Sequence, residues 1–346
     1  MTYLVFPNEN EPIISCQSAI MCPICKLGQT SFLFQKLYKG LNLLHSGIES
    51  IPLNFRKCHV CGIVFSVPLS KEAMQACFAW YEDIYHKEAQ VEARTPCNPI
   101  NQIRYAEWLR LLEPYRKTGK LFETGFGRGE FLMTASKFGW LCSGNEASFN
   151  ACESVRRFGA TVYCTDIGSV DIVGDQDIVV SMGVIEHVPD PHVQFQNYYR
   201  LLRSGGAVFI TTPNYNSLAR LLLGPQCRIL DVEHLFYFTP KTISRLLRMS
   251  GFRIVKCWSK NVNIPEILKG FLPIYQGREA VRTANQEFRQ MLEFNGILKQ
   301  FKAFVNWCIS QSGVGEELYV IAVKSGGELP DIYNDHRNTE TESKKG

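Results

Sequence analysis

The sequence predicts an α/β fold, built on a doubly wound, mostly parallel sheet and preceded by a small cysteine-based module. Two observations lead to this prediction. Predicted strands and helices alternate along the middle of the chain, which is typical of a parallel sheet with helices on both faces. Two Cys-x-x-Cys pairs lie ahead of that region, at a spacing typical of a metal site.

The composition indicates a globular chain that can hold one large domain and a small one. Of its 346 residues, 45% are hydrophobic, which is enough for a sizeable core. The net charge of +4 gives little support for a nucleic-acid partner. No apolar run reaches the roughly 18–20 residues of a membrane span, and residues 1–11 show no signal-peptide pattern. Thirteen cysteines are an odd and dilute set, so we expect reduced thiols in a cytoplasmic protein.

The two Cys-x-x-Cys pairs predict a zinc-ribbon module over residues 1–69. Cys22 and Cys25 form the first pair, and Cys58 and Cys61 form the second, with 32 residues between them. Each pair presents two thiolates from one tight turn, and four thiolates complete a tetrahedral site for Zn²⁺. Because the protein fills every coordination position, we expect a structural ion. A β-hairpin is expected to fill the segment between the pairs.

Residues 70–100 are predicted to form a helical linker region. Two interpretations of its aromatic side chains stay open. They either pack between the module and the next domain, or they place Tyr81 or Tyr85 over an active site.

The glycine-rich turn after the first predicted strand of the large domain carries the main signal for ligand binding. Gly125, Gly127 and Gly129 follow G-x-G-x-G spacing, with Phe126 inside the turn and Glu123 two residues ahead of it. Glycines permit positive φ and a close approach of the ligand, and the N–H groups at the next helix suit a polar group. The spacing is neither that of nicotinamide enzymes nor that of P-loops. Glu123 would repel a pyrophosphate and attract an ammonium group, which favours a cationic amino-acid ligand.

Further candidate ligand-binding residues end the later strands, where doubly wound sheets bind their ligands. Glu146 ends the second strand, 23 residues after Glu123, at the place expected for a carboxylate that binds ribose. Asp166 follows the third strand and could accept a hydrogen from an adenine amino group. Ser181 and Met182 end the fourth strand, beside the expected ligand.

Together these motifs resemble class I S-adenosylmethionine-dependent methyltransferases. The resemblance covers roughly residues 100–325 and rests on the segments 123–129, 145–146, 181–191, 202–206 and 210–214. It implies a seven-stranded sheet whose last strand, over residues 317–324, is antiparallel. It also implies a methyltransferase domain over residues 101–325 with S-adenosylmethionine as cofactor. The glycine turn would hold its methionine part, and the second-strand acid its ribose.

Two features are similar to methyltransferases that act on nucleotide-linked deoxysugars. Those enzymes carry a four-cysteine module and a Glu-His pair before an aromatic run, as Glu233 and His234 do here. In them the pair works in proton abstraction from the sugar. The resemblance implies a sugar nucleotide as the favoured substrate, with His234 as the base and Glu233 assisting it. His187, after the fourth strand, is either a further catalytic residue or a contact of the cofactor.

Three other functions stay open. The module could guide methylation of RNA or a protein, the acceptor could be a quinone-type molecule, or the chain could be a binding protein without activity. The weak net charge argues against RNA, as does the lack of an Asp/Asn-Pro-Pro-aromatic sequence after the fourth strand. The complete set of Glu123, the glycines and Glu146 argues against loss of activity.

Residues 261–312 are predicted to form a helical insertion before the last strand. Its apolar face could pack on the domain, cover the substrate, form a dimer interface or touch a membrane surface. Both a monomer and a homodimer are compatible with the sequence. Residues 326–346 are polar and predicted to be disordered.

Overall fold

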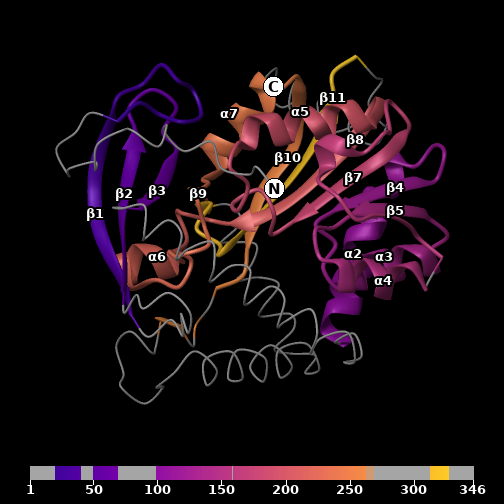
Figure 1. Ribbon diagram of the computed structural model, residues 1–346, viewed down its shortest axis with the longest axis horizontal. Coiled ribbons are helices and arrows are strands. Elements are labelled where there is room, and N and C mark those ends of the chain that lie inside the picture. Colours follow the sequence, from indigo (N-terminus) through magenta and orange to yellow (C-terminus); the bar gives the residue numbers. More distant parts are fainter. Residues whose placement is uncertain are drawn as a thin grey trace, which may run out of the picture.

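The computed structural model describes residues 20–39, 50–68, 99–157, 159–262, 264, 266–267 and 312–326. The predicted linker helix with Tyr81 and Tyr85, most of the insertion 261–312 and almost all of the tail lie outside these residues. Two β-sheets dominate the described part of the chain, and they lie side by side in Figure 1.

The larger sheet has seven strands, in the order β10-β11-β8-β7-β4-β5-β6. Its parallel strands are β4 (Lys120–Thr124), β5 (Leu141–Asn145), β6 (Thr161–Tyr163), β7 (Gln176–Met182) and β8 (Leu202–Pro213). Strand β11 (Glu317–Lys324) inserts antiparallel between β8 and β10 (Phe252–Lys260). The predicted doubly wound, seven-stranded sheet with an antiparallel last strand is therefore confirmed.

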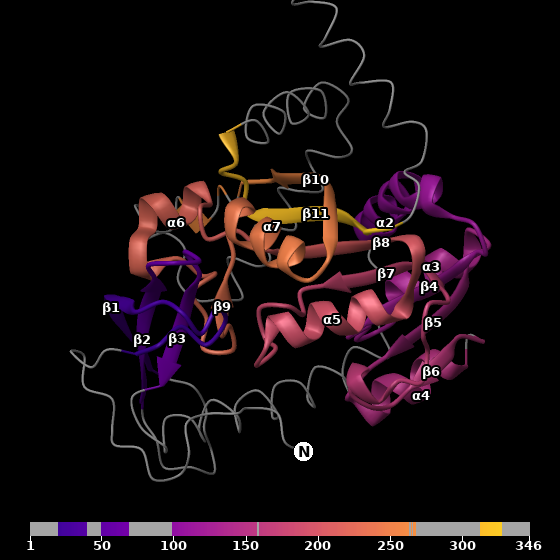
Figure 2. The same ribbon diagram turned by 90° about the horizontal axis from the view of Figure 1, so that it is seen from above.

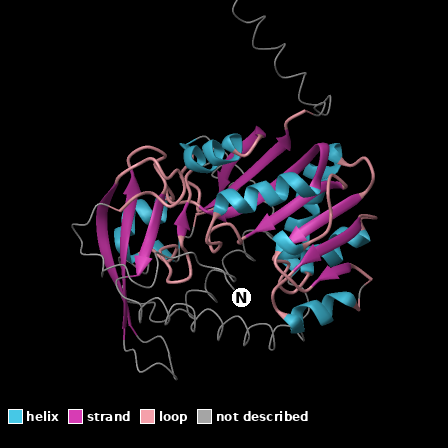
Figure 3. Cartoon of the chain, turned by 45° about the horizontal axis from the view of Figure 1, so that its top comes forward, coloured by secondary structure: helices cyan, strands magenta, loops and turns pink. Residues whose placement is uncertain are grey.

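Helices cover both faces of this sheet (Figures 2 and 3). One face packs against α2 (Pro99–Leu112), α3 (Glu130–Lys137) and α4 (Phe149–Arg156), and the other against α5 (Pro191–Leu201) and α7 (Pro240–Met249). Side chains start several of these helices as N-caps: Ser148 accepts from the Ala151 N–H, and Thr239 forms a capping box with Thr242. Short elements complete the domain: η1 (Glu113–Tyr115), η2 (Ile167–Ser169), α6 (Leu218–Leu223) and η3 (Gly224–Gln226).

The smaller sheet has four antiparallel strands, in the order β1-β2-β3-β9. Strands β1 (Thr30–Lys39), β2 (Ser50–Cys58) and β3 (Val64–Pro68) come from the N-terminal region. Strand β9 (Phe236–Tyr237) comes from the loop between α6 and α7 of the large domain. The two sheets also share one hydrophobic cluster, in which Ile63 and Phe65 pack with side chains of α7 and the larger sheet.

None of the helices in the described part of the chain combines the length and apolarity that crossing a membrane requires.

Asp177, near the start of β7, is a buried carboxylate that fixes the turn before β4. Its Oδ2 accepts backbone N–H groups of Lys117, Thr118 and Gly119 at 2.8, 2.6 and 2.7 Å, and Arg203 pairs with Oδ1. Burial alone would raise the pKa of Asp177, but Arg203 and the three N–H donors outweigh it and hold the pKa below its usual value.

We expect Asp177→Asn to lower the free energy of unfolding by about 3 kcal/mol, because it removes the charge that compensates Arg203 and three N–H groups. Denaturant unfolding measures this loss. Asp175→Asn is the matched control, because Asp175 pairs with Lys120 at 2.7 Å on the surface, where an ion pair contributes about 1 kcal/mol or less. Equal effects of the two substitutions would contradict the assignment.

Candidate functional site

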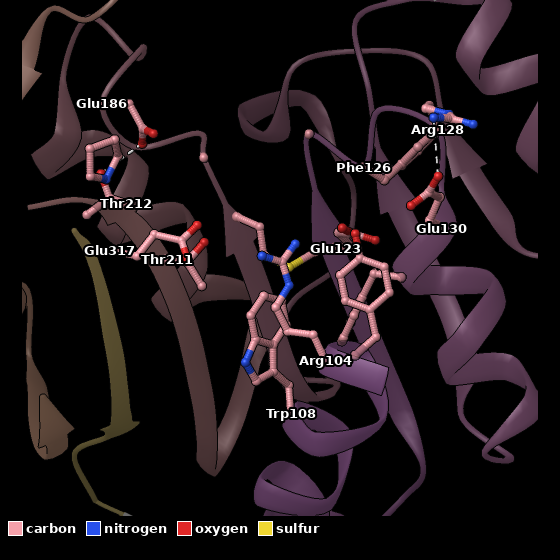
Figure 4. A pocket seen from close by; sticks show the side chains of 16 residues that line it. Arg104, Trp108, Glu123, Phe126, Arg128, Glu130, Glu186, Thr211, Thr212 and Glu317 are labelled. Atoms are coloured by element: carbon pink, nitrogen blue, oxygen red, sulfur yellow. Dashed lines mark hydrogen bonds and ion pairs between the residues drawn. The ribbon is translucent and has the colours of Figure 1, made fainter. Parts of the chain in front are cut away.

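A cavity of about 410 Å³ opens at the carboxyl ends of the central strands, on the α2 side of the sheet. Figure 4 shows Arg104 and Trp108 rising into it from α2, with Glu123 and Phe126 beside the glycine turn. Of the predicted cofactor residues, Glu123, Gly125, Phe126 and Met182 line this cavity. The cavity lies where a doubly wound sheet binds its ligand.

The glycine turn has the conformation that its sequence predicts, since all three glycines have positive φ. Gly127 has φ +51°, and an added Cβ would meet no atom within 4 Å, so the space beside its Cα is open. Gly129 is needed for packing instead, because a Cβ there would lie 2.3 Å from Cγ2 of Val155 on α4.

Glu123 is 3% exposed, and its Oε2 has no hydrogen-bond partner among the described residues. Burial raises the pKa of Glu123 well above its usual value, and the nearby Glu146 carboxylate raises it further. An unpaired buried acceptor is costly, and a cationic hydrogen-bond donor in the cavity would satisfy it.

Arg104 is a cavity residue that no sequence motif indicated. Its guanidinium lies 4.9 Å from the centre of the Trp108 ring, and Nη2 donates to Oδ1 of Asn101 at 3.1 Å. Its Nε is buried and has no hydrogen-bond partner in the described part of the chain. Burial alone would lower the pKa of Arg104, but Glu317 above all outweighs it and keeps the pKa raised. The cavity therefore holds an unpaired cationic donor as well as the unpaired Glu123 oxygen.

The remaining predicted cofactor residues do not line this cavity. Glu146 lies behind the glycine turn, where Oε2 accepts the Gly127 N–H at 2.8 Å and Oε1 accepts the N–H groups of Ala147 and Ser148. Asp166 accepts the Gly168 N–H at 2.7 Å and caps η2.

The side chain of Ser181 points to the α5 face of the sheet, away from the cavity. Its side chain is fully buried, and its Oγ accepts the Tyr198 hydroxyl of α5 at 2.8 Å. Met182, the next residue, points to the opposite face and lines the cavity. The two neighbours therefore have different surroundings.

The two predicted catalytic histidines lie together although they are far apart in sequence. The rings of His187 and His234 stand edge to face, with centroids 4.8 Å apart. Nδ1 of His187 donates to the Glu233 carbonyl at 3.0 Å, and Nδ1 of His234 donates to the Ile229 carbonyl at 2.8 Å. Because a carbonyl only accepts, both neutral rings keep Nε2 as an acceptor. Glu233 thus contacts His187 through its backbone.

Glu186 connects this histidine pair to the cavity and was not singled out from the sequence. It is 2% exposed, lines the cavity and accepts the Thr212 hydroxyl at 2.9 Å. Its Oε1 lies 4.0 Å from Nε2 of His187. Burial raises the pKa of Glu186 to about 7. Burial lowers the pKa of His187 to about 3, helped by His234, and lowers that of His234 as well.

The four cysteines of the predicted metal site lie close together. The Sγ atoms of Cys22 and Cys61 are 3.6 Å apart, as are those of Cys25 and Cys58. Tetrahedral thiolates about 2.3 Å from Zn²⁺ would be about 3.8 Å apart, so the cluster fits such an ion. The N–H groups of Val60 and Cys61 lie 3.3 and 3.4 Å from the Cys58 sulfur.

A second group could also hold a cation. Glu186, His187 and His234 each offer one ligand atom, and these atoms lie within 4.8 Å of one another. Histidines that bind metals usually donate their other ring N–H to a carbonyl or carboxylate, as both rings do here.

Part of the chain matches a known protein family. Residues 100–257 match the family model described as "Methyltransferase domain". The chain is 26% identical over 151 residues to a ubiquinone biosynthesis O-methyltransferase from Coxiella burnetii, an alignment that covers 42% of this chain and 60% of that protein. A protein of the same description from Aeromonas salmonicida is 40% identical over 65 residues, 19% of this chain and 25% of that protein. The chain thus spans less than two thirds of these relatives.

Solved methyltransferase structures are also similar to the chain. One is a 1,6-didemethyltoxoflavin-N1-methyltransferase from Burkholderia thailandensis with bound S-adenosylhomocysteine, with a TM-score of 0.44 and 13% identity over 76% of this chain and 95% of that one. Another is a methyltransferase from Archaeoglobus fulgidus, with a TM-score of 0.43 and 20% identity over 64% of this chain and 93% of that one. The strand order is that of the class I methyltransferase fold, and residues 100–257 match the methyltransferase-domain model.

Proposed function

We propose that the chain transfers a methyl group from S-adenosylmethionine to a small-molecule acceptor. The observation that carries the proposal is the pair of unpaired groups in the cavity, Oε2 of Glu123 and Nε of Arg104. Arg104 is a cation that can bind the carboxylate of an amino acid, and Glu123 can accept from its ammonium group, whose charge would favour the ionised carboxylate. An added Cβ at Gly127 would meet no atom, which leaves space for the cofactor at the turn, and we infer that Glu146 accepts a hydrogen bond from its ribose.

On the acceptor side, His234 takes the proton and Glu186 supports it. The bound cofactor supplies an electrophilic methyl group, so the protein has to orient the acceptor, remove its proton and exclude water. Nε2 of His234 is an unprotonated acceptor at neutral pH, because burial lowers its pKa. The neighbouring His187 ring packs against it, and Glu186 joins both to the cavity. Glu233 assists the base, and a sugar nucleotide is the favoured acceptor.

A quinol-type hydroxyl is the second candidate acceptor. The curated relatives are ubiquinone biosynthesis O-methyltransferases, and a buried imidazole could equally deprotonate a phenol. Incubation with labelled S-adenosylmethionine and separate panels of sugar nucleotides, quinol precursors and RNA distinguishes these acceptors. Labelling of RNA alone would contradict the proposal of a small-molecule acceptor.

We also propose that Cys22, Cys25, Cys58 and Cys61 hold a structural Zn²⁺. The sulfur spacing supports this, as do the N–H groups that point at Cys58, because such donors favour a thiolate.

We expect S-adenosylmethionine and S-adenosylhomocysteine to bind, and Gly127→Val and Glu146→Ala each to weaken both by about tenfold to a hundredfold. The valine would occupy the open space at a positive φ. The alanine would remove an acceptor whose hydrogen bonds contribute about 1.5–3 kcal/mol each. Calorimetry measures both affinities. Glu153→Ala is the control, because Glu153 lies on the surface and pairs with Arg156. Unchanged affinity in both variants would contradict the proposal that Gly127 and Glu146 bind the cofactor.

The pH dependence should distinguish His234 from Glu186 as the base. A base acts when unprotonated, and the pKa of His234 is lowered, so kcat/KM should stay constant down to below the ordinary histidine value of about 6.5. Activity should then fall as the pH decreases and the imidazole becomes protonated. A midpoint of the pH profile near 7 would instead match Glu186, whose pKa is raised to about 7, and would indicate that Glu186 is the base.

A further inference from the structure

The loop that carries His234, residues 227–238, runs between the large domain and the four-cysteine module. From the large domain, the Glu186 carbonyl accepts the N–H groups of Leu235 and Phe236 at 2.9 and 3.2 Å. From the module, β3 pairs with β9, with Phe65 opposite Phe236 and Val64 opposite Tyr237. The loop therefore forms backbone contacts on both sides.

Ser66 of β3 forms the contact nearest to the proposed base. Its N–H donates to the Leu235 carbonyl at 3.0 Å, and its hydroxyl donates to the His234 carbonyl at 2.8 Å. Ser66 is 7% exposed, so these bonds are protected from water. The Tyr237 hydroxyl lies 3.0 Å from the same His234 carbonyl.

Strand β1 contacts the loop on the other side of His234. The Tyr38 hydroxyl and the Lys36 ammonium group donate to the Leu230 carbonyl at 2.5 and 2.7 Å. The residue before it, Ile229, offers the carbonyl that accepts Nδ1 of His234. The module thus contacts the loop at His234 itself and at Leu230, four residues earlier in the sequence. Leu230 is the neighbour of Ile229, whose carbonyl sets the tautomer of the imidazole.

The cysteine cluster is directly connected to β3. Cys58 ends β2, its N–H donates to the Ile63 carbonyl at 2.9 Å, and β3 begins three residues after Cys61. Arg245 of α7 donates to the Val60 carbonyl at 2.7 Å between the last two cysteines. In contrast, no described residue of the module lines the 410 Å³ cavity.

We propose that the four-cysteine module is a positioning element for the 227–238 loop, with Ser66 as the positioning residue and the cysteine site as the part that holds β3 in place. The inference rests on the proposed role of His234 as base. It assigns the module a task in catalysis that is separate from cofactor binding, because the module contacts the base loop and not the cavity.

The test compares the full-length, metal-loaded protein with Ser66→Ala, Ser66→Thr and Gln35→Ala. Ser66→Ala should speed amide exchange in residues 227–238 about fivefold, the effect of losing one buried hydrogen bond, while S-adenosylhomocysteine affinity stays unchanged. Ser66→Thr keeps the hydroxyl and should restore slow exchange. Gln35→Ala removes only a contact to Asn54 within the module and should have no effect. Removing metal with a chelator should speed exchange in the same segment.

Unchanged exchange in Ser66→Ala, or an effect of Ser66→Ala on S-adenosylhomocysteine affinity as large as its effect on exchange, would overturn the inference. The first result would show that the hydroxyl does not hold the loop, and the second that the damage is general. Neither readout depends on the identity of the base. Full turnover in His234→Ala would instead contradict the proposed role of His234 as the base. It would not change the interpretation of the exchange results.

Discussion

Replacing His234 with alanine should leave S-adenosylhomocysteine binding intact and slow turnover by about 10²–10⁴-fold, the usual contribution of a general base. The side chain does not line the cavity that would hold the methionine part of the cofactor, whereas Glu186, whose carboxylate lies within 4.8 Å of it, does. Calorimetry with S-adenosylhomocysteine and single-turnover kinetics with labelled cofactor separate binding from chemistry.

His187→Ala is the matched control for this prediction. His187 is a neighbouring imidazole whose Nδ1 also bonds to a carbonyl, so its removal disturbs the same surroundings without removing the proposed base. We expect a smaller loss of turnover from His187→Ala than from His234→Ala. Full activity in His234→Ala would eliminate His234 as the base and make Glu186 and His187 the remaining candidates.

Replacing one of the four cysteine ligands should unfold the N-terminal module more than any other part of the protein. We expect one zinc ion per chain in wild type, and Cys22→Ser should lose the ion and unfold β1 to β3. A structural zinc contributes about 10–16 kcal/mol of folding free energy in zinc-finger peptides. The hydrophobic contacts of β1 to β3 cannot replace a contribution of this size. Elemental analysis measures the ion, and limited proteolysis measures the unfolding. The larger sheet should survive in part.

Cys257→Ser is the matched control for the metal prediction. Cys257 is a half-buried thiol of β10, outside the cysteine cluster, so its replacement should leave the zinc content unchanged. Wild-type protein that is prepared without chelators and contains no metal would refute the site.

The sequence predicted the larger sheet well because its signals are local. Alternating strands and helices, glycine turns and capping residues each act within a few positions, and so do the Cys-x-x-Cys pairs. Strand alternation could also have separated Ser181 from Met182, since successive side chains point to opposite faces of a sheet.

Other parts of the site depend on contacts that no local pattern reveals. Strand β9 has two residues, too few for any periodic signal, and its partner β3 lies in another part of the chain. Arg104 resembles a surface residue of an amphipathic helix, and only the packing of α2 against the sheet turns it towards Glu123. The burial of Glu186 arises in the same way, from the loop that covers it.

The pairing of β3 with β9 has a consequence for the order in which a new chain can fold. All four cysteines of the proposed metal site precede Ile63, so this site can close while the rest of the protein is still being synthesised. The partner of Phe65, Phe236, emerges from the ribosome on the order of ten seconds later at ordinary elongation rates. During that interval β3 is an open β-edge, the kind of surface at which nascent chains associate wrongly. Slower elongation between these two residues should therefore increase aggregation of the newly made protein.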